Sequence, residues 1–375
     1  MSSVLEHRRD YLRLMRQFTL DNGFFTVTDI QKSAGIPRST AQDWVNRLLR
    51  EGCVLMRDEK RGRNAARYAA ISAMPSSTCR RIFTTVHGDD VAIYHECVSG
   101  ACAAFCGYHH SLAGGVLSQV SRDGTLLRES ATVGRKEIAV GLPPLSAVGI
   151  FGIERDGDTI IQHIRCIGGP AYSLSDMMSR AEGVIHVESA SRNHIVEGKI
   201  QTSALIQVTI GLDDTDTKEG GATFALALAL LNHISRIKGV IPISHQVVML
   251  NPDVYTKTAG NSASYIEVAV LPARYDSLVE KVRRFVADES LSDEWGIAIR
   301  TGLDVPEGLR EYGVQVRSKV VARTVAEATA ERFGISLFGG NGIIGALGAV
   351  ALTNLPNEVL LDPSRDLPEL FFVSG

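Results

Sequence analysis

A strand that ends in three closely spaced aspartates places the strongest constraint on this chain. Residues 206–210 alternate as a half-buried strand does, and the sequence Gly211-Leu212-Asp213-Asp214-Thr215-Asp216 follows directly. A helix is expected to begin near Gly221. Carboxylates at a strand end beside a helix N-terminus can bind Mg²⁺, and the backbone amides there can receive phosphate oxygens. The alternative is an exposed acidic turn in which an aspartate caps the helix.

The pattern along the rest of the chain predicts an α+β multidomain protein. After residue 204 expected strands and helices alternate, which predicts an α/β layered nucleotide-binding domain over residues 204–375. Residues 73–203 carry mostly strand patterns and predict a central, mostly β domain of unknown role. Residues 1–72 show helix, helix, turn, helix and hairpin patterns, in the order of a winged helix-turn-helix.

Composition places the chain among folded proteins without a membrane partner, and we expect a cytoplasmic location. It is 45% hydrophobic and 22% charged, with no run of about 18 apolar residues and no apolar signal-peptide core. The net charge of −3 is uneven, because residues 1–72 contain 13 Lys and Arg against 8 Asp and Glu, whereas the rest contains 26 against 34. A basic module on an acidic body predicts a polyanion partner for the first and a cation for the second.

The N-terminal pattern predicts a nucleic-acid partner, either DNA or RNA. In a helix-turn-helix the second helix enters the major groove, and here its reading face is expected to carry Arg38, Ser39, Thr40, Gln42 and Asn46. The expected wing would follow the phosphates through Lys60, Arg61 and Arg63. The alternative is a dimerisation or protein-docking module, and a homodimer is one expected assembly.

The six cysteines are too few and too clustered for a secreted disulfide scaffold. Three of them recur at close spacing, namely Cys97, Cys102 and Cys106, with Cys79 upstream and histidines nearby at His95, His109 and His110. They are candidates for binding zinc or an iron–sulfur cluster, although C-x4-C-x3-C matches none of the common frameworks. Buried thiols in an alanine- and glycine-rich core segment are the alternative.

Two further loop patterns follow the acidic loop. The first runs through Met249-Leu250-Asn251-Pro252 and Lys257-Thr258-Ala259-Gly260-Asn261, and the second is Gly340-Asn341-Gly342-Ile343-Ile344-Gly345. Too few residues follow Gly345 for this G-x-G-x-x-G to open a dinucleotide fold. Its glycines either let the backbone approach phosphate or allow close packing of a small-residue helix face.

Together with residues 211–223, these segments resemble, in the same order, the kinase-like catalytic domain of archaeal isoleucine tRNA agmatidine synthetase. That family condenses agmatine onto the anticodon cytidine at the expense of ATP, through a phosphorylated cytidine. The resemblance implies that Asp213, Asp214 and Asp216 hold Mg²⁺ and the ATP phosphates, and that Thr223 accepts phosphate from ATP. It also implies nucleotide contacts from Gly211, Lys257, Asn261, Gly340 and Gly342.

The resemblance has one departure within its motifs. Where the family has arginine before Gly-Asn, this chain has Ala259, so one phosphate-directed charge is missing. The N-terminal and middle segments resemble an uncharacterised methanogen protein family that shares the acidic loop.

Two functional hypotheses follow. The first is an ATP- and Mg²⁺-dependent phosphoryl-transfer enzyme, acting on RNA or a small substrate, with a nucleic-acid-binding winged helix. The second is a transcription regulator whose C-terminal domain senses a nucleotide without turnover. The three carboxylates together with Thr223 favour catalysis, because a sensor needs no phosphate acceptor.

Overall fold

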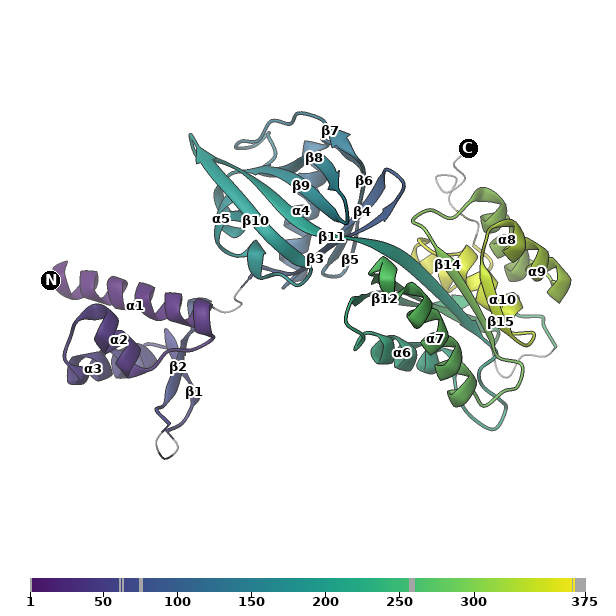
Figure 1. The fold of residues 1–375 in the computed structure, drawn as a ribbon, viewed down its shortest axis with the longest axis horizontal. Coiled ribbons are helices and arrows are strands. Elements are labelled where there is room, and N and C mark those ends of the chain that lie inside the picture. The colour runs from purple at the N-terminus through teal and green to yellow at the C-terminus, as the bar shows by residue number, and fades with distance from the viewer. Residues whose placement is uncertain are drawn as a thin grey trace.

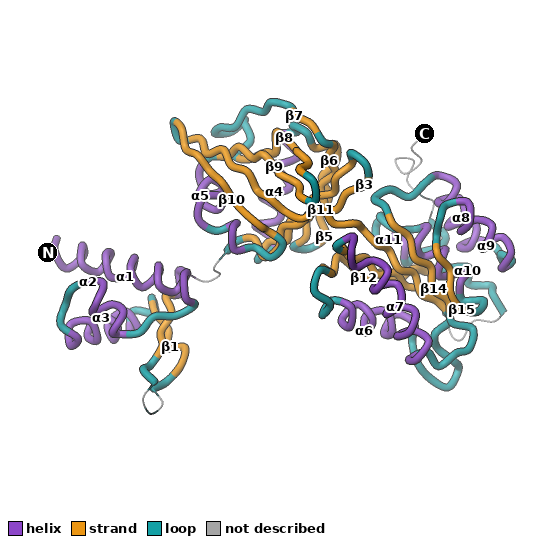
Figure 2. The backbone as a smooth tube through the Cα atoms, viewed as in Figure 1, coloured by secondary structure: helices purple, strands orange, loops and turns teal. Residues whose placement is uncertain are grey.

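The computed structural model describes residues 2–60, 62, 64–73, 77–255, 260–365 and 367, and it is a mixed α+β protein (Figures 1 and 2). The N-terminal elements are α1 (Ser2–Asn22), α2 (Val27–Ala34), α3 (Arg38–Arg50) and the antiparallel hairpin β1 (Val54–Asp58) and β2 (Arg67–Ala70). This is the order of helices and hairpin that the sequence predicts.

Local capping and burial explain why the N-terminal helices form. Thr26 and Asp29 make a reciprocal capping box at the start of α2, and Gly35 ends that helix in a left-handed conformation. Ala41, Val45 and Leu48 recur on one face of α3, where they are buried together with Met15 of α1 and other apolar side chains. The opposite face of α3 is left polar and solvent-accessible.

The central segment folds as two antiparallel groups of strands around an apolar core. The first group has the order β5-β6-β4-β3, and the second has the order β7-β8-β9-β11-β10. The two groups join where β3 pairs in parallel with β11, through Thr84 with Ala204 and Thr85 with Leu205. The elements are β3 (Cys79–His87), β4 (Asp90–Cys97), α4 (Gly100–Ala113), β5 (Leu117–Asp123), β6 (Leu126–Thr132), β7 (Gly134–Arg135), β8 (Val148–Asp156), β9 (Thr159–Cys166), α5 (Gly168–Asp176) and β10 (Val184–Arg192).

The C-terminal segment is a three-layer arrangement around an antiparallel sheet of order β12-β13-β11-β14-β15. Its chain order β11-α6-β12-β13-α7-β14 is the β-α-β-β-α-β order of ferredoxin-like sheets. Helices α6 and α7 cover one face, and α8, α9 and α10 cover the other (Figure 1). The elements are β11 (Ile195–Asp213), α6 (Thr223–Ile234), β12 (Val240–Met249), β13 (Ser262–Val270), α7 (Tyr275–Glu289), β14 (Gly296–Thr301), α8 (Glu307–Ser318), α9 (Arg323–Arg332), β15 (Ser336–Gly339), α10 (Ile343–Ala351) and α11 (Asn357–Leu360).

Strand β11 belongs to both the central and the C-terminal arrangement. Its 19 residues pair first with β9 and β10, and then with β13 and β14. The boundary expected between Ser203 and Ala204 therefore falls inside one continuous strand, and the curled mixed sheet runs through it (Figure 2). Among the described helices, none has the length and apolar character needed to cross a membrane.

Candidate functional site at the acidic loop

The acidic loop joins the C-terminal end of β11 to the first residue of α6. Asp213 is the last residue of β11 and is 6% exposed, whereas Asp214 is exposed. Asp214 has φ +53°, a left-handed conformation that aspartate tolerates better than bulkier residues. The turn therefore separates two adjacent carboxylates, one directed into the protein and one toward solvent.

Thr223 ties the two ends of this loop together. Its Oγ1 accepts a hydrogen bond from the Thr215 backbone N–H at 3.3 Å and one from Thr215 Oγ1 at 3.1 Å. The Thr223 hydroxyl donates in turn to Asp216 Oδ1 at 3.2 Å. Thr223 is only 5% exposed, at the N-terminus of α6. The expected phosphate acceptor thus contacts one of the expected cation ligands.

The glycine loop before α10 packs directly on the acidic loop. A Cβ added at Gly342 would lie 2.6 Å from the Asp213 carbonyl oxygen and 2.7 Å from the Glu294 carbonyl oxygen, so only glycine fits. Glu294 accepts a hydrogen bond at 2.8 Å from the Asn341 backbone N–H, and Gly340 packs against its backbone. Sequence reasoning misses Glu294, because no motif surrounds it and only the fold brings it to the loop.

The motif formed by residues 249–252 and 257–261 approaches the Asp213 side chain through Leu250. A Cβ added at Gly345 of α10 would lie 1.7 Å from Asp213 Oδ2 and 2.9 Å from Leu250 Cδ1. The Asn261 side-chain amide donates to the Asn251 carbonyl oxygen at 2.8 Å, which closes the loop that follows Leu250. Lys257 lies outside the described residues. The three sequence motifs therefore converge around Asp213.

Gly211 occupies a different environment from the loop residues. It is buried in the middle of the sheet, where an added Cβ would lie 2.1 Å from the Ala346 carbonyl oxygen of α10. The absence of a side chain lets α10 approach β11 closely. This position gives Gly211 a packing function beneath the site.

Burial and neighbouring carboxylates raise the pKa values of Asp213 and Asp214. Burial, and then the charge of Asp214, raise the pKa of Asp213 well above its usual range. Partial burial, followed by the charges of Asp216 and Glu294, raises the pKa of Asp214. A divalent cation would relieve this repulsion, and oxygen atoms are the donors that Mg²⁺ prefers. The carboxylates of Asp213, Asp214 and Asp216 are therefore candidate ligands for Mg²⁺, although the described structure does not bring one oxygen of each within 4.8 Å of the others.

The N-terminal candidates lie together on the solvent side of α3 and on the hairpin. Arg38, Ser39 and Asn46 are exposed, and Thr40 and Gln42 are partly exposed. Gln42 donates to Asn46 at 3.0 Å, so these two side chains form one polar patch. Lys60 is exposed beside the hairpin turn, whereas Arg61 and Arg63 lie outside the described residues.

The cysteine candidates separate into two groups. Cys97 and Cys106 lie close to His95, with the ligand atoms of all three within 4.8 Å of one another. Cys102 lines the same cavity but does not belong to that group. His109 and His110 have other partners, because His109 Nδ1 accepts from the Ala147 N–H and His110 Nδ1 contacts Glu129 at 2.5 Å.

The acidic-loop site places three aspartates between the end of strand β11 and the start of helix α6. Residues 209–270 match the family described as the TiaS TCKD domain. The tRNA 2-agmatinylcytidine synthetase TiaS of Pyrococcus horikoshii is 32% identical over 160 residues, which is 40% of this chain and 37% of that protein. The corresponding synthetase of Methanocorpusculum labreanum is 31% identical over 180 residues, or 44% of this chain and 42% of that protein.

A longer alignment links the chain to an uncharacterised protein, MJ0921, of Methanocaldococcus jannaschii. The two are 25% identical over 273 residues, which is 72% of this chain and 89% of that protein. Solved structures of TiaS with its tRNA and ATP, and with its tRNA, AMPCPP and agmatine, align with 25% and 26% identity and TM-scores of 0.37 and 0.34. They cover 40% and 39% of this chain and 37% and 36% of theirs.

These comparisons establish a relation between this chain and the TiaS family, carried by sequence around the acidic loop. The chain spans less than half the length of the synthetases that it matches.

Proposed function

We propose that this protein is an ATP- and Mg²⁺-dependent phosphoryl-transfer enzyme, related to the synthetases that modify tRNA. The observation that carries the proposal is the convergence of three motifs on Asp213, within the segment that matches the TiaS domain. Asp213, Asp214 and Asp216 would hold Mg²⁺. The cation would neutralise charge on the β- and γ-phosphates and orient them for transfer.

The hydrogen bonds of Thr223 support a role as the first phosphate acceptor. In that step Thr223 Oγ1 forms a bond to the γ-phosphorus, the bond from that phosphorus to the β,γ-bridging oxygen breaks, and ADP leaves. The hydroxyl proton passes to Asp216 Oδ1, to which Thr223 already donates at 3.2 Å. Because Thr223 is buried, residues 214–222 must move before a γ-phosphate can reach it.

The N-terminal segment supports a nucleic-acid substrate or target. Its α3 helix presents the polar patch of Gln42 and Asn46, and Lys60 adds a positive charge beside the hairpin turn. The second hypothesis, a regulator that senses a nucleotide without turnover, uses the same surface. Consumption of ATP separates the two.

The decisive experiment is incubation of the purified full chain with γ-labelled ATP and Mg²⁺, with and without transfer RNA. We expect formation of ADP that requires Mg²⁺, with label on the protein or on RNA. If the chain binds the nucleotide but forms no ADP, with or without RNA, the result would contradict the enzyme hypothesis and favour the regulator that senses a nucleotide. A chain in which Asp213 is replaced by Asn serves as the inactive control.

A further inference from the structure

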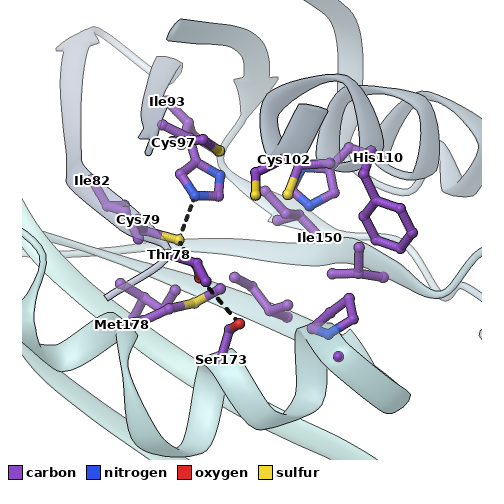
Figure 3. Close-up of a pocket in the computed structure, with 18 of the residues that line it drawn as sticks. Thr78, Cys79, Ile82, Ile93, Cys97, Cys102, His110, Ile150, Ser173 and Met178 are labelled. Atoms are coloured by element: carbon purple, nitrogen blue, oxygen red, sulfur yellow. Dashed lines mark hydrogen bonds between the residues drawn. The ribbon is translucent and has the colours of Figure 1, made fainter. Parts of the chain in front are cut away.

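A cavity of about 640 Å³ lies in the central segment (Figure 3), and no residue of the acidic loop lines it. Strands β3, β4, β6, β8, β9 and β11 and helices α4 and α5 line it, and its wall is mostly apolar, with Ile82, Ile93, Ile150 and Met178 among its residues. A volume of this size is typical of small-molecule sites, which lie between about 300 and 1,000 Å³. The proposed phosphoryl transfer uses none of these residues.

Sulfur and nitrogen atoms gather at one end of this cavity. Cys79 and Cys97 pair across strands β3 and β4, so their side chains lie on the same face, and His95 shares it because it is two residues from Cys97. Helix α4 faces them with Cys102 and Cys106, which are four residues apart and therefore on one side of the helix. Figure 3 shows Cys79 and Cys97 on the strand side and Cys102 on the helix side.

Three of these groups have the spacing of ligands to one metal ion. Donor atoms of His95, Cys97 and Cys106 lie within 4.8 Å of one another, and His95 and Cys97 are 5% and 1% exposed. Around a tetrahedral zinc ion, with bonds of about 2.0–2.3 Å, such atoms are about 3.5–3.8 Å apart. The three donor atoms would therefore have to approach one another by about 1 Å at most to bind one zinc ion.

Cys79 has a different relation to the group. Its Sγ lies 2.8 Å from His95 Nε2, but it is not among the atoms that all approach one another within 4.8 Å. A histidine that ligates a metal usually makes a second hydrogen bond through its other ring nitrogen, and this bond fixes the orientation of the ring. Cys79 is placed to provide that bond.

Two buried polar atoms indicate that the cavity also receives a ligand. Glu129 Oε2 and Gln162 Nε2 have no hydrogen-bond partner within the described part of the chain, although both residues line the cavity and are 0% and 1% exposed. Buried polar groups are normally paired, so an acceptor and a donor are left for a bound molecule. Glu129 Oε1 is already occupied by His110.

We infer that His95, Cys97 and Cys106 bind one zinc ion whose fourth coordination position faces the cavity. Two thiolates and one imidazole are a ligand set used by zinc sites that keep an open position. The open position would take a thiol or carboxylate of a small, largely apolar molecule, while Glu129 and Gln162 contact its polar groups. This site is independent of the proposed phosphoryl transfer.

The first test is the metal content of the full chain, purified under reducing conditions. We expect about one zinc per chain, lost in Cys97→Ser and in Cys106→Ser but retained in Cys102→Ser, the matched control from the same helix and cavity. Cys79→Ser should keep the ion with an affinity about 10- to 100-fold lower. Absence of zinc from the wild type, together with failure to take up added zinc, would overturn the site.

Cobalt substitution tests the coordination in the wild-type chain, so the result does not depend on whether the cysteine variants fold. Co²⁺ bound by thiolates gives sulfur-to-metal charge-transfer bands that carboxylates of the acidic loop cannot produce. We expect these bands in the wild type and in Asp213→Asn, and a shift of the visible cobalt bands when 2-mercaptoethanol is added. Bands that do not respond to this thiol, or equal loss of metal from Cys79→Ser and Cys97→Ser, would overturn the open fourth position.

Discussion

The Asp213 carboxylate lies against Gly345 of α10 so closely that a Cβ at Gly345 would be 1.7 Å from Asp213 Oδ2. An added methyl group must displace this oxygen, because the nearest atoms are the ends of two side chains, Asp213 and Leu250, and no backbone atom is as close. Gly345 therefore sets the position of the carboxylate.

Gly345→Ala should weaken Mg²⁺-dependent ATP binding by about 10-fold or more, with an overpacking cost of about 1–3 kcal/mol in unfolding free energy. The matched control is Gly348→Ala, one turn along the same helix, whose Cβ would meet Val316 Cγ2 at 2.5 Å. The control should lose similar stability and keep its ATP affinity. Titration of both variants by calorimetry decides the prediction, and equal affinities would refute it.

Asp214→Asn should abolish Mg²⁺-dependent ATP binding while leaving the fold intact, because this side chain is exposed and its loss removes one charge from the cation site. Lys218→Gln, on the same loop and also exposed, is the control for a general change in surface charge. Binding that still depends on Mg²⁺ in Asp214→Asn would remove the residue from the site.

The raised pKa of Asp213 predicts how stability depends on pH. The folded protein holds this proton more tightly than the unfolded chain, so stability without Mg²⁺ should fall as pH rises from the unfolded pKa toward the folded pKa. Mg²⁺ binds the ionised form, so its stabilising effect should grow with pH. Thermal unfolding measured from about pH 4 upward checks this, and Asp213→Asn should show a weaker dependence. An unchanged pH profile in that variant would argue against the assignment.

Labelled phosphate should appear on the wild-type chain and fall to background in Thr223→Ala. Thr223→Ser keeps the hydroxyl and should retain label, which separates loss of the acceptor from loss of the loop's hydrogen bonds. Thr215→Val removes the hydroxyl that donates to Thr223 Oγ1 but keeps the backbone hydrogen bond and the proposed acceptor, and it should lower the rate rather than the final extent. Full labelling of Thr223→Ala would exclude Thr223.

Neutralising Lys60, Arg61 and Arg63 should weaken nucleic-acid binding and reduce its salt dependence, by roughly 0.9 in logarithmic slope for each phosphate of duplex DNA that the chain no longer neutralises. The control for net charge is the triple change of Lys281, Arg283 and Arg284 to Gln, which removes three positive charges from the exposed side of α7. Changes at Gln42 or Asn46 should alter sequence preference instead. No affinity for DNA or RNA at low salt would favour a docking module.

The acidic loop can be predicted from sequence because its signal is local, an apolar strand followed at once by carboxylates and then by a helix. Glu294 and the contact between Gly345 and Asp213 cannot, because distant segments meet there only in the folded chain. The element order of the N-terminal segment is predictable for a related reason, since caps and apolar spacing act within one or two turns.

For the cysteine cluster, the sequence indicates the candidate residues but not which of them come together in the fold. Its spacing along the chain draws attention to Cys97, Cys102 and Cys106, but pairing between β3 and β4 and the turn of α4 decide which thiols meet. The length of β11 also exceeds the prediction, because the sequence pattern indicates a strand only over residues 206–211. The first half of β11 lies between β9 and β10, and its residues are alternately buried and more exposed. This half contains Gly198, which weakens the strand signal in the sequence.

Strand β11 connects the cavity directly with the acidic loop. Ile200 lines the cavity and Asp213 begins the acidic loop, and about 43 Å of uninterrupted strand separates them at roughly 3.3 Å per residue. Neighbouring strands pair with both edges of β11 over residues 200–202 and 208–212, whereas residues 203–207 between them are paired on one edge only. One strand thus contributes to both the cavity wall and the acidic loop, and residues 203–207 are the stretch through which a displacement of one end would have to reach the other.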